Sequence, residues 1–285
     1  MSIVNILSKL TITILIIIVV ITGFNWLRTP HLSPEISLKC ETPDTPEQLT
    51  KLVIVRGMYD DREAYYFAKR FARFSWYSGL FSDGFRHELY SGLYNITFYG
   101  VGMSHFEFNM PFKERYKTEI LSEAQCIEKA DRLISEIKEY FNSSLEYREK
   151  RIKKKFPSYE FGTVVSANTP YYYRIDYDIY YDGVELLGEG TDAWVEVCDK
   201  EILGYQLHFP VLEERGFDKV YLTPIEALNR LDAGSIVNNM NFGYYTDFVF
   251  PKNFSVVEYG YLINGVFNGD FMGMFIRAMA GDVYK

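Results

Sequence analysis

The chain has 285 residues, of which 48% are hydrophobic and 17% aromatic, and its 38 acidic and 30 basic residues give a formal net charge of −8. This composition excludes a disordered protein and supplies enough apolar material for one large domain or two small ones. A negative surface repels nucleic acid and anionic lipid, so no nucleic-acid partner is expected.

The first element in chain order is an uncharged apolar segment at residues 10–27, long enough to cross a bilayer as a helix. Trp26 lies at one end, where indole rings favour the membrane interface. A cleaved signal peptide is the alternative, although "VITGFNW" lacks a small-residue cleavage site. We therefore expect a single-pass signal anchor in the cell membrane, with residues 1–9 in the cytoplasm and the rest of the chain outside it.

An extended linker is expected at residues 28–48, which contain four prolines and few large apolar side chains. Residues 49–118 then show one amphipathic helical pattern among alternating strand patterns. The predicted order is strand, helix, strand, strand, at residues 51–55, 60–77, 93–100 and 105–112. This pattern predicts an N-terminal α+β subdomain.

Residues 119–285 begin with a capping box formed by Ser122 and Gln125. An apolar stripe follows it at helical spacing: Ala124, Ile127, Ala130, Ile134, Ile137 and Phe141. A second box, Thr223 and Glu226, opens another helix, and strands follow both helices. The expected fold class is α+β, with a transmembrane helix and antiparallel sheets packed on a few amphipathic helices. The two similar helix starts leave open a pair of tandem helix-plus-sheet units.

A tyrosine-rich hairpin is predicted around Asp182-Gly183, a favoured pair for a two-residue turn. Period-two alternation predicts one face packed on the helix stripe, consisting of Tyr173, Ile175, Tyr177, Ile179 and Tyr181. The opposite face mixes tyrosine with charge and is the candidate partner surface: Tyr172, Arg174, Asp176, Asp178, Tyr180 and Asp182. An EF-hand register fails here, because its fifth and sixth positions would be Tyr180 and Tyr181. A plain solvated sheet face is the competing interpretation.

The basic run "REKRIKKK" at residues 148–155 is interpreted as a solvated connector rather than a nucleic-acid patch. Three cysteines cannot all pair within one chain, and a Cys40–Cys198 bridge stays open. Sequons for N-glycosylation occur at Asn95, Asn142 and Asn253.

Motifs that carry chemistry are scarce. "GMSHF" at residues 102–106 lacks the second glycine of a nucleophile elbow. His105 and Glu107 share a strand face and could present two metal ligands, with His208 as a third. Ordinary surface or hydrogen-bonded roles compete with that hypothesis. The sequence assigns no catalytic residue, no metal ligand and no cofactor.

The order of the capped helix "LSEAQCIEKADRLISEI", the tyrosine-rich hairpin, "WVEVCDKEILGYQLHF" and "LTPIEALNRL" resembles the PepSY-like domains, including the YycH/YycI-type regulators of sensor kinases. The closing "YGYLINGVFNGDFMGMFIRAMAG" is also similar to the last hairpin of that group. The resemblance covers residues 119–285. It implies a non-catalytic module that binds or restrains a protein partner in or on the membrane.

Three functions follow from these patterns. The first is a membrane-anchored extracytoplasmic binding or regulatory module without catalytic activity. The second is an exported metal-dependent hydrolase that uses His105, Glu107 and the aspartate row. The third is a structural cell-envelope protein that forms homo-oligomers through exposed aromatic strands, because Tyr and Phe together number 46 residues.

Overall fold

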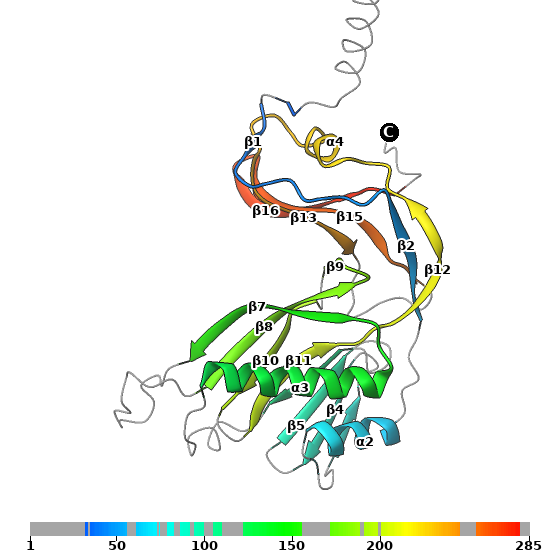
Figure 1. Cartoon of the computed structure of the whole chain (residues 1–285), viewed down its shortest axis with the longest axis vertical. Coiled ribbons are helices and arrows are strands. Elements are labelled where there is room, and N and C mark those ends of the chain that lie inside the picture. Colours follow the sequence, from blue (N-terminus) through cyan, green and yellow to red (C-terminus); the bar gives the residue numbers. More distant parts are fainter. Residues whose placement is uncertain are drawn as a thin grey trace, which may run out of the picture. The chain divides into compact units, whose positions relative to one another are not determined.

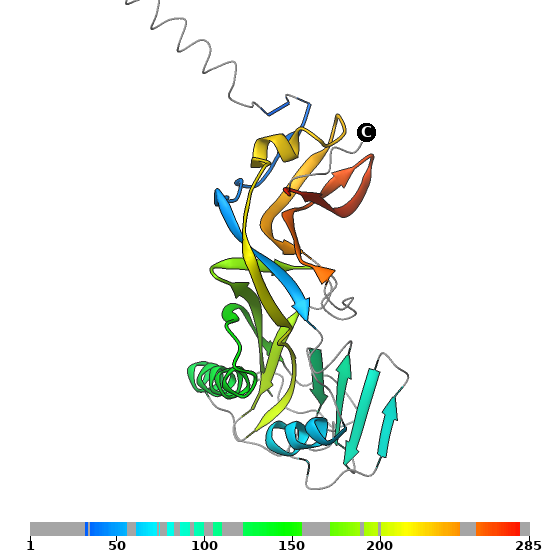
Figure 2. The same ribbon diagram turned by 90° about the vertical axis from the view of Figure 1, so that its right-hand side faces the viewer.

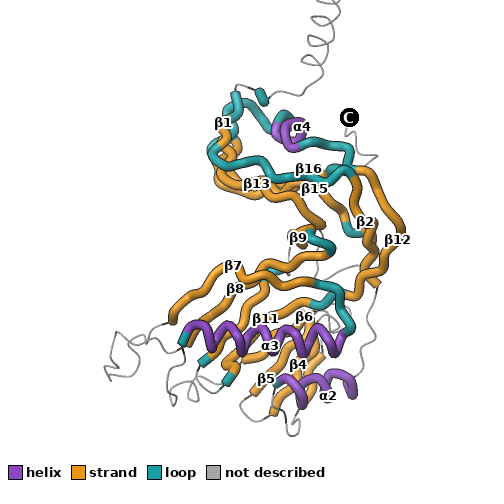
Figure 3. Tube along the Cα trace, viewed as in Figure 1, coloured by secondary structure: helices purple, strands orange, loops and turns teal. Residues whose placement is uncertain are grey.

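The computed structural model describes residues 32–33, 35–55, 61–72, 74, 79–82, 86–91, 94–99, 105–109, 122–155, 172–188, 191–198, 201–245 and 255–279. Within these ranges the chain forms sixteen strands and three helices, so the fold is mainly β (Figure 3). The prediction of an α+β fold was therefore wrong. Strands β7 (Glu146–Lys155), β12 (Val211–Lys219) and β13 (Ile236–Tyr245) are rich in charged or polar residues and lack a clear alternation, so the sequence pattern missed them.

The predicted membrane anchor is corrected as well. Among the residues that the structure describes, none belongs to a helix long and apolar enough to cross a bilayer. Residues 10–27, on which the anchor was predicted, lie outside the described ranges. The membrane as a partner and the location of the chain outside the cytoplasm both stay predictions.

The chain divides into two compact units. Residues 1–45, 221–241 and 261–278 form the first unit, and residues 46–220, 242–260 and 279–285 form the second. The boundary predicted at residues 118–119 lies inside the second unit, where β6 (His105–Asn109) pairs with β11 (Ile202–His208). Strands from both predicted parts thus belong to one sheet.

Strands β13 and β15 (Glu258–Phe267) contribute residues to both units, so the first unit contains only part of each. Its strand order is β16 (Asp270–Arg277), β15, β13, and β1 (Ser37–Leu38) pairs in parallel with β13. Part of the predicted linker is therefore in a sheet, and Ile36 beside β1 is buried. The short helix α4 (Pro224–Leu228) begins at the predicted capping box of Thr223 and Glu226.

The second unit contains the larger set of strands. Strand β7 pairs along one edge of β8 (Figure 1), and β9 and β10 pair with its other edge. The order continues from β10 as β11–β6–β5–β4–β3. Their bounds are β3 Gly79–Ser82, β4 Arg86–Ser91, β5 Tyr94–Tyr99, β8 Tyr172–Tyr181, β9 Val184–Leu187 and β10 Ala193–Val197. The end of β13 pairs in parallel with β9. A separate three-stranded sheet has the order β12–β2–β14, where β2 is Gln48–Val55 and β14 is Ser255–Val256.

Two helices of the second unit cover one face of its large sheet (Figures 1 and 2). Helix α3 (Glu123–Phe141) packs on β8 and β10 and begins at the predicted capping box of Ser122 and Gln125. Helix α2 (Asp61–Phe71) packs on β4. The ring of Phe67 in α2 lies 5.6 Å from that of Phe141 in α3 and 5.8 Å from that of Phe98 in β5. These apolar contacts place the core between the helices and the sheet.

Candidate functional site

The β8–β9 hairpin forms at the turn that the sequence indicates. Asp182 and Gly183 both have positive φ, at 49° and 76°, as a two-residue turn between twisted strands requires. The face of β8 toward α3 is buried and consists of Tyr173, Ile175, Tyr177, Ile179 and Tyr181. The hydroxyl of Tyr177 donates a hydrogen bond of 2.9 Å to the Asp131 carboxylate of α3, which fixes the helix on this face.

Strand β7 pairs with residues 172–180 of β8, so the basic run at residues 148–155 belongs to an edge strand and is not a solvated connector. Its register places Arg148 opposite Asp178, Arg151 opposite Asp176 and Lys153 opposite Arg174, with a bulge between Glu149 and Arg151. Residues that lie directly opposite each other share a face of the sheet. Arg148, Arg151 and Lys153 therefore join the β8 residues that point away from α3, whereas Lys154 lies on the α3 face and pairs with Glu123 at 3.4 Å.

Asp176 is at the centre of this charged face. Its carboxylate lies 2.5 Å from Lys153 Nζ, 2.8 Å from Arg174 Nε and 3.4 Å from Arg151 Nε. Burial raises the pKa of Asp176, but the hydrogen bonds and positive charges of Lys153 and Arg174 outweigh burial and hold the pKa below its ordinary value. Asp176 is thus a buried anion, only 8% exposed, and not the solvated carboxylate that alternation predicts.

Aromatic rings support two of the cations on this face. The guanidinium of Arg174 lies over the Trp194 ring of β10, 4.4 Å from its centre, and that of Arg148 lies 4.0 Å from the centre of the Tyr180 ring. Such cation–π contacts hold a charged group in place without neutralising it. The indole Nε1 of Trp194 donates to Gln206 Oε1 at 3.2 Å, which fixes the ring under Arg174.

Charge on the two strands is unbalanced. Together β7 and β8 carry seven basic and four acidic side chains, a net charge of +3, whereas the whole chain carries −8. Lys150 pairs with Asp178 at 2.6 Å, and this hydrogen bond raises the pKa of Lys150. Three cations surround the Asp176 carboxylate, and the buried Glu196 of β10 lies opposite Arg174 on the same face, so one positive charge remains in excess there. We call this surface, formed by the outward residues of β7, β8 and β10, the basic face.

The predicted partner residues occupy one strand and its turn. Arg174, Asp178 and Tyr180 are half-buried on the basic face, and Asp182 is exposed at the turn. Tyr172 packs against the buried pair Cys198 and Leu203. The basic residues of β7 and the ring of Trp194 were not predicted as part of this surface, because cross-strand pairing, not spacing along the chain, brings them to β8. Whether this surface binds a partner stays a prediction.

The residues of the hydrolase hypothesis lie on neighbouring strands. His105 of β6 is opposite His208 of β11, and Glu107 is opposite Gln206. His208 is buried, and its Nε2 lies 3.1 Å from the Asp192 carbonyl oxygen. The side chains of His105 and Glu107 are outside the description. Among the side chains that are described, no group of three or more His, Cys, Asp or Glu could hold a metal ion.

The cysteines and sequons have varied surroundings. Cys40, Cys126 and Cys198 are all free thiols, so the open Cys40–Cys198 bridge is not formed. Asn95 lies within strand β5. Asn142 is the exposed left-handed C-cap of α3. The third sequon, Asn253, lies outside the described residues.

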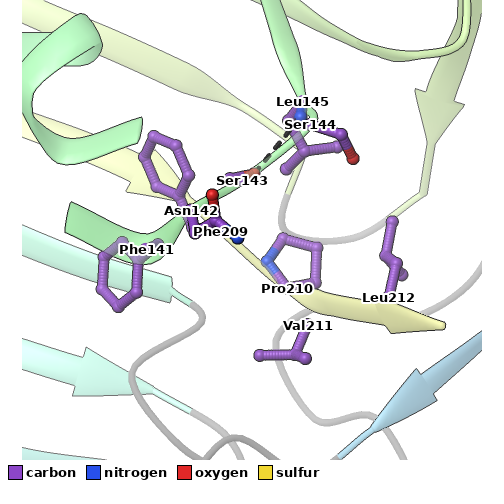
Figure 4. Close-up of a pocket in the computed structure, with 9 residues that line it drawn as sticks. All are labelled: Phe141, Asn142, Ser143, Ser144, Leu145, Phe209, Pro210, Val211 and Leu212. Atoms are coloured by element: carbon purple, nitrogen blue, oxygen red, sulfur yellow. Dashed lines mark hydrogen bonds between the residues drawn. The ribbon is translucent and has the colours of Figure 1, made fainter. Parts of the chain in front are cut away.

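A small pocket of about 100 Å³ lies where α3 ends and where β11 leads into β12 (Figure 4). Its lining consists of Phe141, Asn142, Ser143, Ser144, Leu145, Phe209, Pro210, Val211 and Leu212. Ligand pockets usually measure about 300–1,000 Å³, so this one has room for a few waters and not for a typical ligand. The stacked rings of Phe141 and Phe209, 5.5 Å apart, make it part of the helix–sheet packing.

Comparisons with known proteins inform the fold alone. No family model matches the chain, and no curated protein matches it either. A solved structure, that of an uncharacterized protein from Eubacterium rectale, is similar with a TM-score of 0.51 at 10% sequence identity. The likeness covers 90% of this chain and 92% of that one. The resemblance of residues 119–285 to PepSY-like domains stays a prediction.

Proposed function

We propose that the protein is a non-catalytic binding module whose basic face recognises an acidic segment of a partner protein. The observation that carries this proposal is the excess of positive charge around Asp176. Lys153, Arg174 and Arg151 all lie within 3.4 Å of its single carboxylate. A second carboxylate, supplied by a partner, would find cations that are already held in position.

The rigidity of the basic face supports this role. Arg174 is fixed by its hydrogen bond of 2.8 Å to Asp176 and by the Trp194 ring, and Arg148 is fixed by Tyr180. Arginine on an aromatic surface presents its N–H groups with little loss of side-chain entropy on binding. Tyr, Trp and Arg are also the side chains enriched at protein interfaces.

The charge of the rest of the chain favours a short acidic protein segment over a polyanion. Strands β7 and β8 together carry +3 within a chain of net charge −8, so the remainder of the chain is strongly negative. A long nucleic acid or an anionic membrane would meet that negative surface and be repelled. A segment of a few acidic residues can stay within the basic face.

The test is binding of a fluorescein-labelled peptide with eight glutamates, followed by fluorescence anisotropy on the full chain. In the double variant Arg151→Gln/Lys153→Gln, two partly exposed charges are lost. Each of these charges is expected to contribute about 0.7 kcal/mol to the free energy of binding, so the loss of both should raise Kd about tenfold. The matched control is Arg132→Gln/Lys138→Gln on α3, which changes the net charge equally on the other side of the sheet and should leave Kd nearly unchanged.

Three outcomes would overturn the proposal. The first is that the peptide fails to bind, and the second is that both double variants weaken binding equally. The third is that single-stranded DNA or phosphatidylserine vesicles bind more tightly than the peptide. Affinity should also fall as salt rises, because the contacts are partly exposed ion pairs.

A further inference from the structure

The hairpin of β15 and β16 ends in a turn with the same chemistry as the β8–β9 hairpin. Its two turn residues, Asn268 and Gly269, have φ values of 53° and 91°. Strand β16 is the last in its sheet among the described strands (Figure 1, red). Its outer edge therefore offers backbone N–H and C=O groups for pairing.

The side chains in the middle of β16 do not prevent another strand from pairing with this edge. The strand reads DFMGMFIR, so its charges stand at the two ends and its middle is apolar. Phe271 is 72% exposed and Met272 is 43% exposed. Because successive residues of a strand point to opposite faces, apolar surface is exposed on both faces of the hairpin. Exposed hydrophobic edge strands of this kind pair with other strands.

Hairpin geometry defines which backbone groups point outward. In a two-residue hairpin the residues that flank the turn, here Phe267 and Asp270, form a hydrogen-bonded pair. Alternation then turns the backbone groups of the odd-numbered residues 271–277 toward the open edge. Antiparallel strands match outward residues with outward residues. Two copies of β16 can therefore pair only odd with odd and even with even.

We propose that two copies of the chain form a dimer by antiparallel pairing of their β16 edges, with the two-fold axis at Met274. In this register Arg277 of one copy lies opposite Phe271 of the other, which allows a cation–π contact and covers the most exposed ring of the strand. Phe275 lies opposite Gly273 of the second copy. An aromatic ring across from a glycine on an edge strand compensates for the missing side chain.

Contacts within a single chain give one reason why position 273 is a glycine. A Cβ added to Gly273 would lie 2.7 Å from Asn264 Oδ1, too close for an ordinary contact. The Asn264 side chain thus occupies the space beside Gly273, and a larger residue at this position would have to displace it. The interface is self-complementary, as a two-fold dimer requires.

The experiment is disulfide trapping in the full chain with Cys40→Ser as background, because Cys126 and Cys198 are buried. Met274→Cys places two cysteines at the axis, where the Cα atoms of a non-hydrogen-bonded pair are about 4.5 Å apart, within disulfide range. Met272→Cys places them about 14 Å apart, too far to bond. After mild oxidation, Met274→Cys should run mainly as a covalent dimer on a non-reducing gel, and Met272→Cys should run as a monomer.

The paired variants separate a defined dimer from random collision. Met272 is exposed whereas Met274 is half-buried, so random collision would link Met272→Cys faster. Equal linking, faster linking of Met272→Cys, or no linking of either would each overturn the proposal. Thermal unfolding of the reduced variants checks that both are folded. The inference is independent of the proposed function, since the peptide-binding variants lie in the other unit.

Discussion

The two open edge strands, β7 and β16, differ in how their sequences treat an unpaired backbone. Six of the ten residues of β7 are basic, and like charges oppose the approach of a second β7 edge. Strand β16 has charges only at its two ends. Both are edge strands among the described strands, and they differ mainly in their side chains, apart from the bulge between Glu149 and Arg151 of β7. Charge repulsion therefore prevents the β7 edge from pairing with a second β7, whereas nothing comparable opposes pairing of two β16 edges.

This difference separates two kinds of recognition. Basic side chains of β7 lie on the same sheet face as the outward residues of β8, so a partner would be bound by charged side chains on that face. On β16 the backbone edge itself is offered, with Phe271 and Met272 exposed on either side. Charged side chains give salt-dependent binding of an acidic segment, whereas backbone pairing gives a defined register that depends little on salt.

The largest expected effect concerns the packing that holds β7 and β8 in place. Tyr177→Ala should lower the free energy of unfolding by about 2–4 kcal/mol, because the ring is 3% exposed and its hydroxyl holds Asp131. Tyr180→Ala, on the basic face, should cost below about 1 kcal/mol, since it removes a half-buried ring and one cation–π contact. Denaturant unfolding of both variants measures the difference. A larger loss for Tyr180→Ala would mean that the basic face is packed and cannot bind a partner.

A smaller effect is expected at Asp176. Its pKa is held down in the folded state, so its carboxylate stabilises the fold above its unfolded pKa of about 3.9, and that contribution is lost as pH falls through the lower, folded pKa. Asp176→Asn should lower stability by roughly 1–2 kcal/mol at pH 7. Below the folded pKa the two proteins should be equally stable. A difference that persists unchanged from pH 7 to pH 2 would show that the charge of Asp176 contributes nothing.

Local sequence rules predicted the caps and turns well. The capping boxes of Ser122 and Thr223 and the turn at Asp182-Gly183 are all present in the structure. So is the hairpin turn at Asn268-Gly269. These features depend on side chains within four residues of one another, and neighbouring residues in the sequence are enough to specify them.

Strand pairing between distant segments was not predictable in the same way. Strand β7 reads EYREKRIKKK, and nothing in its pattern indicates a strand until Arg151 and Lys153 are placed against Asp176, more than twenty residues away. Alternation along β8 was correct for its buried face but placed Asp176 in solvent, because alternation says nothing about the neighbouring strand. The missed strands also explain why the fold is mainly β and not α+β.

Hydrogen–deuterium exchange of the full chain at low and high concentration tests the contrast between the two edges most directly. If β16 is the self-pairing edge, the amides of Phe271, Gly273 and Phe275 should exchange more slowly as concentration rises, because they become hydrogen-bonded across the dimer. The amides of β7 should exchange at the same rate at both concentrations. Slower exchange along β7 with no change along β16 would contradict the account.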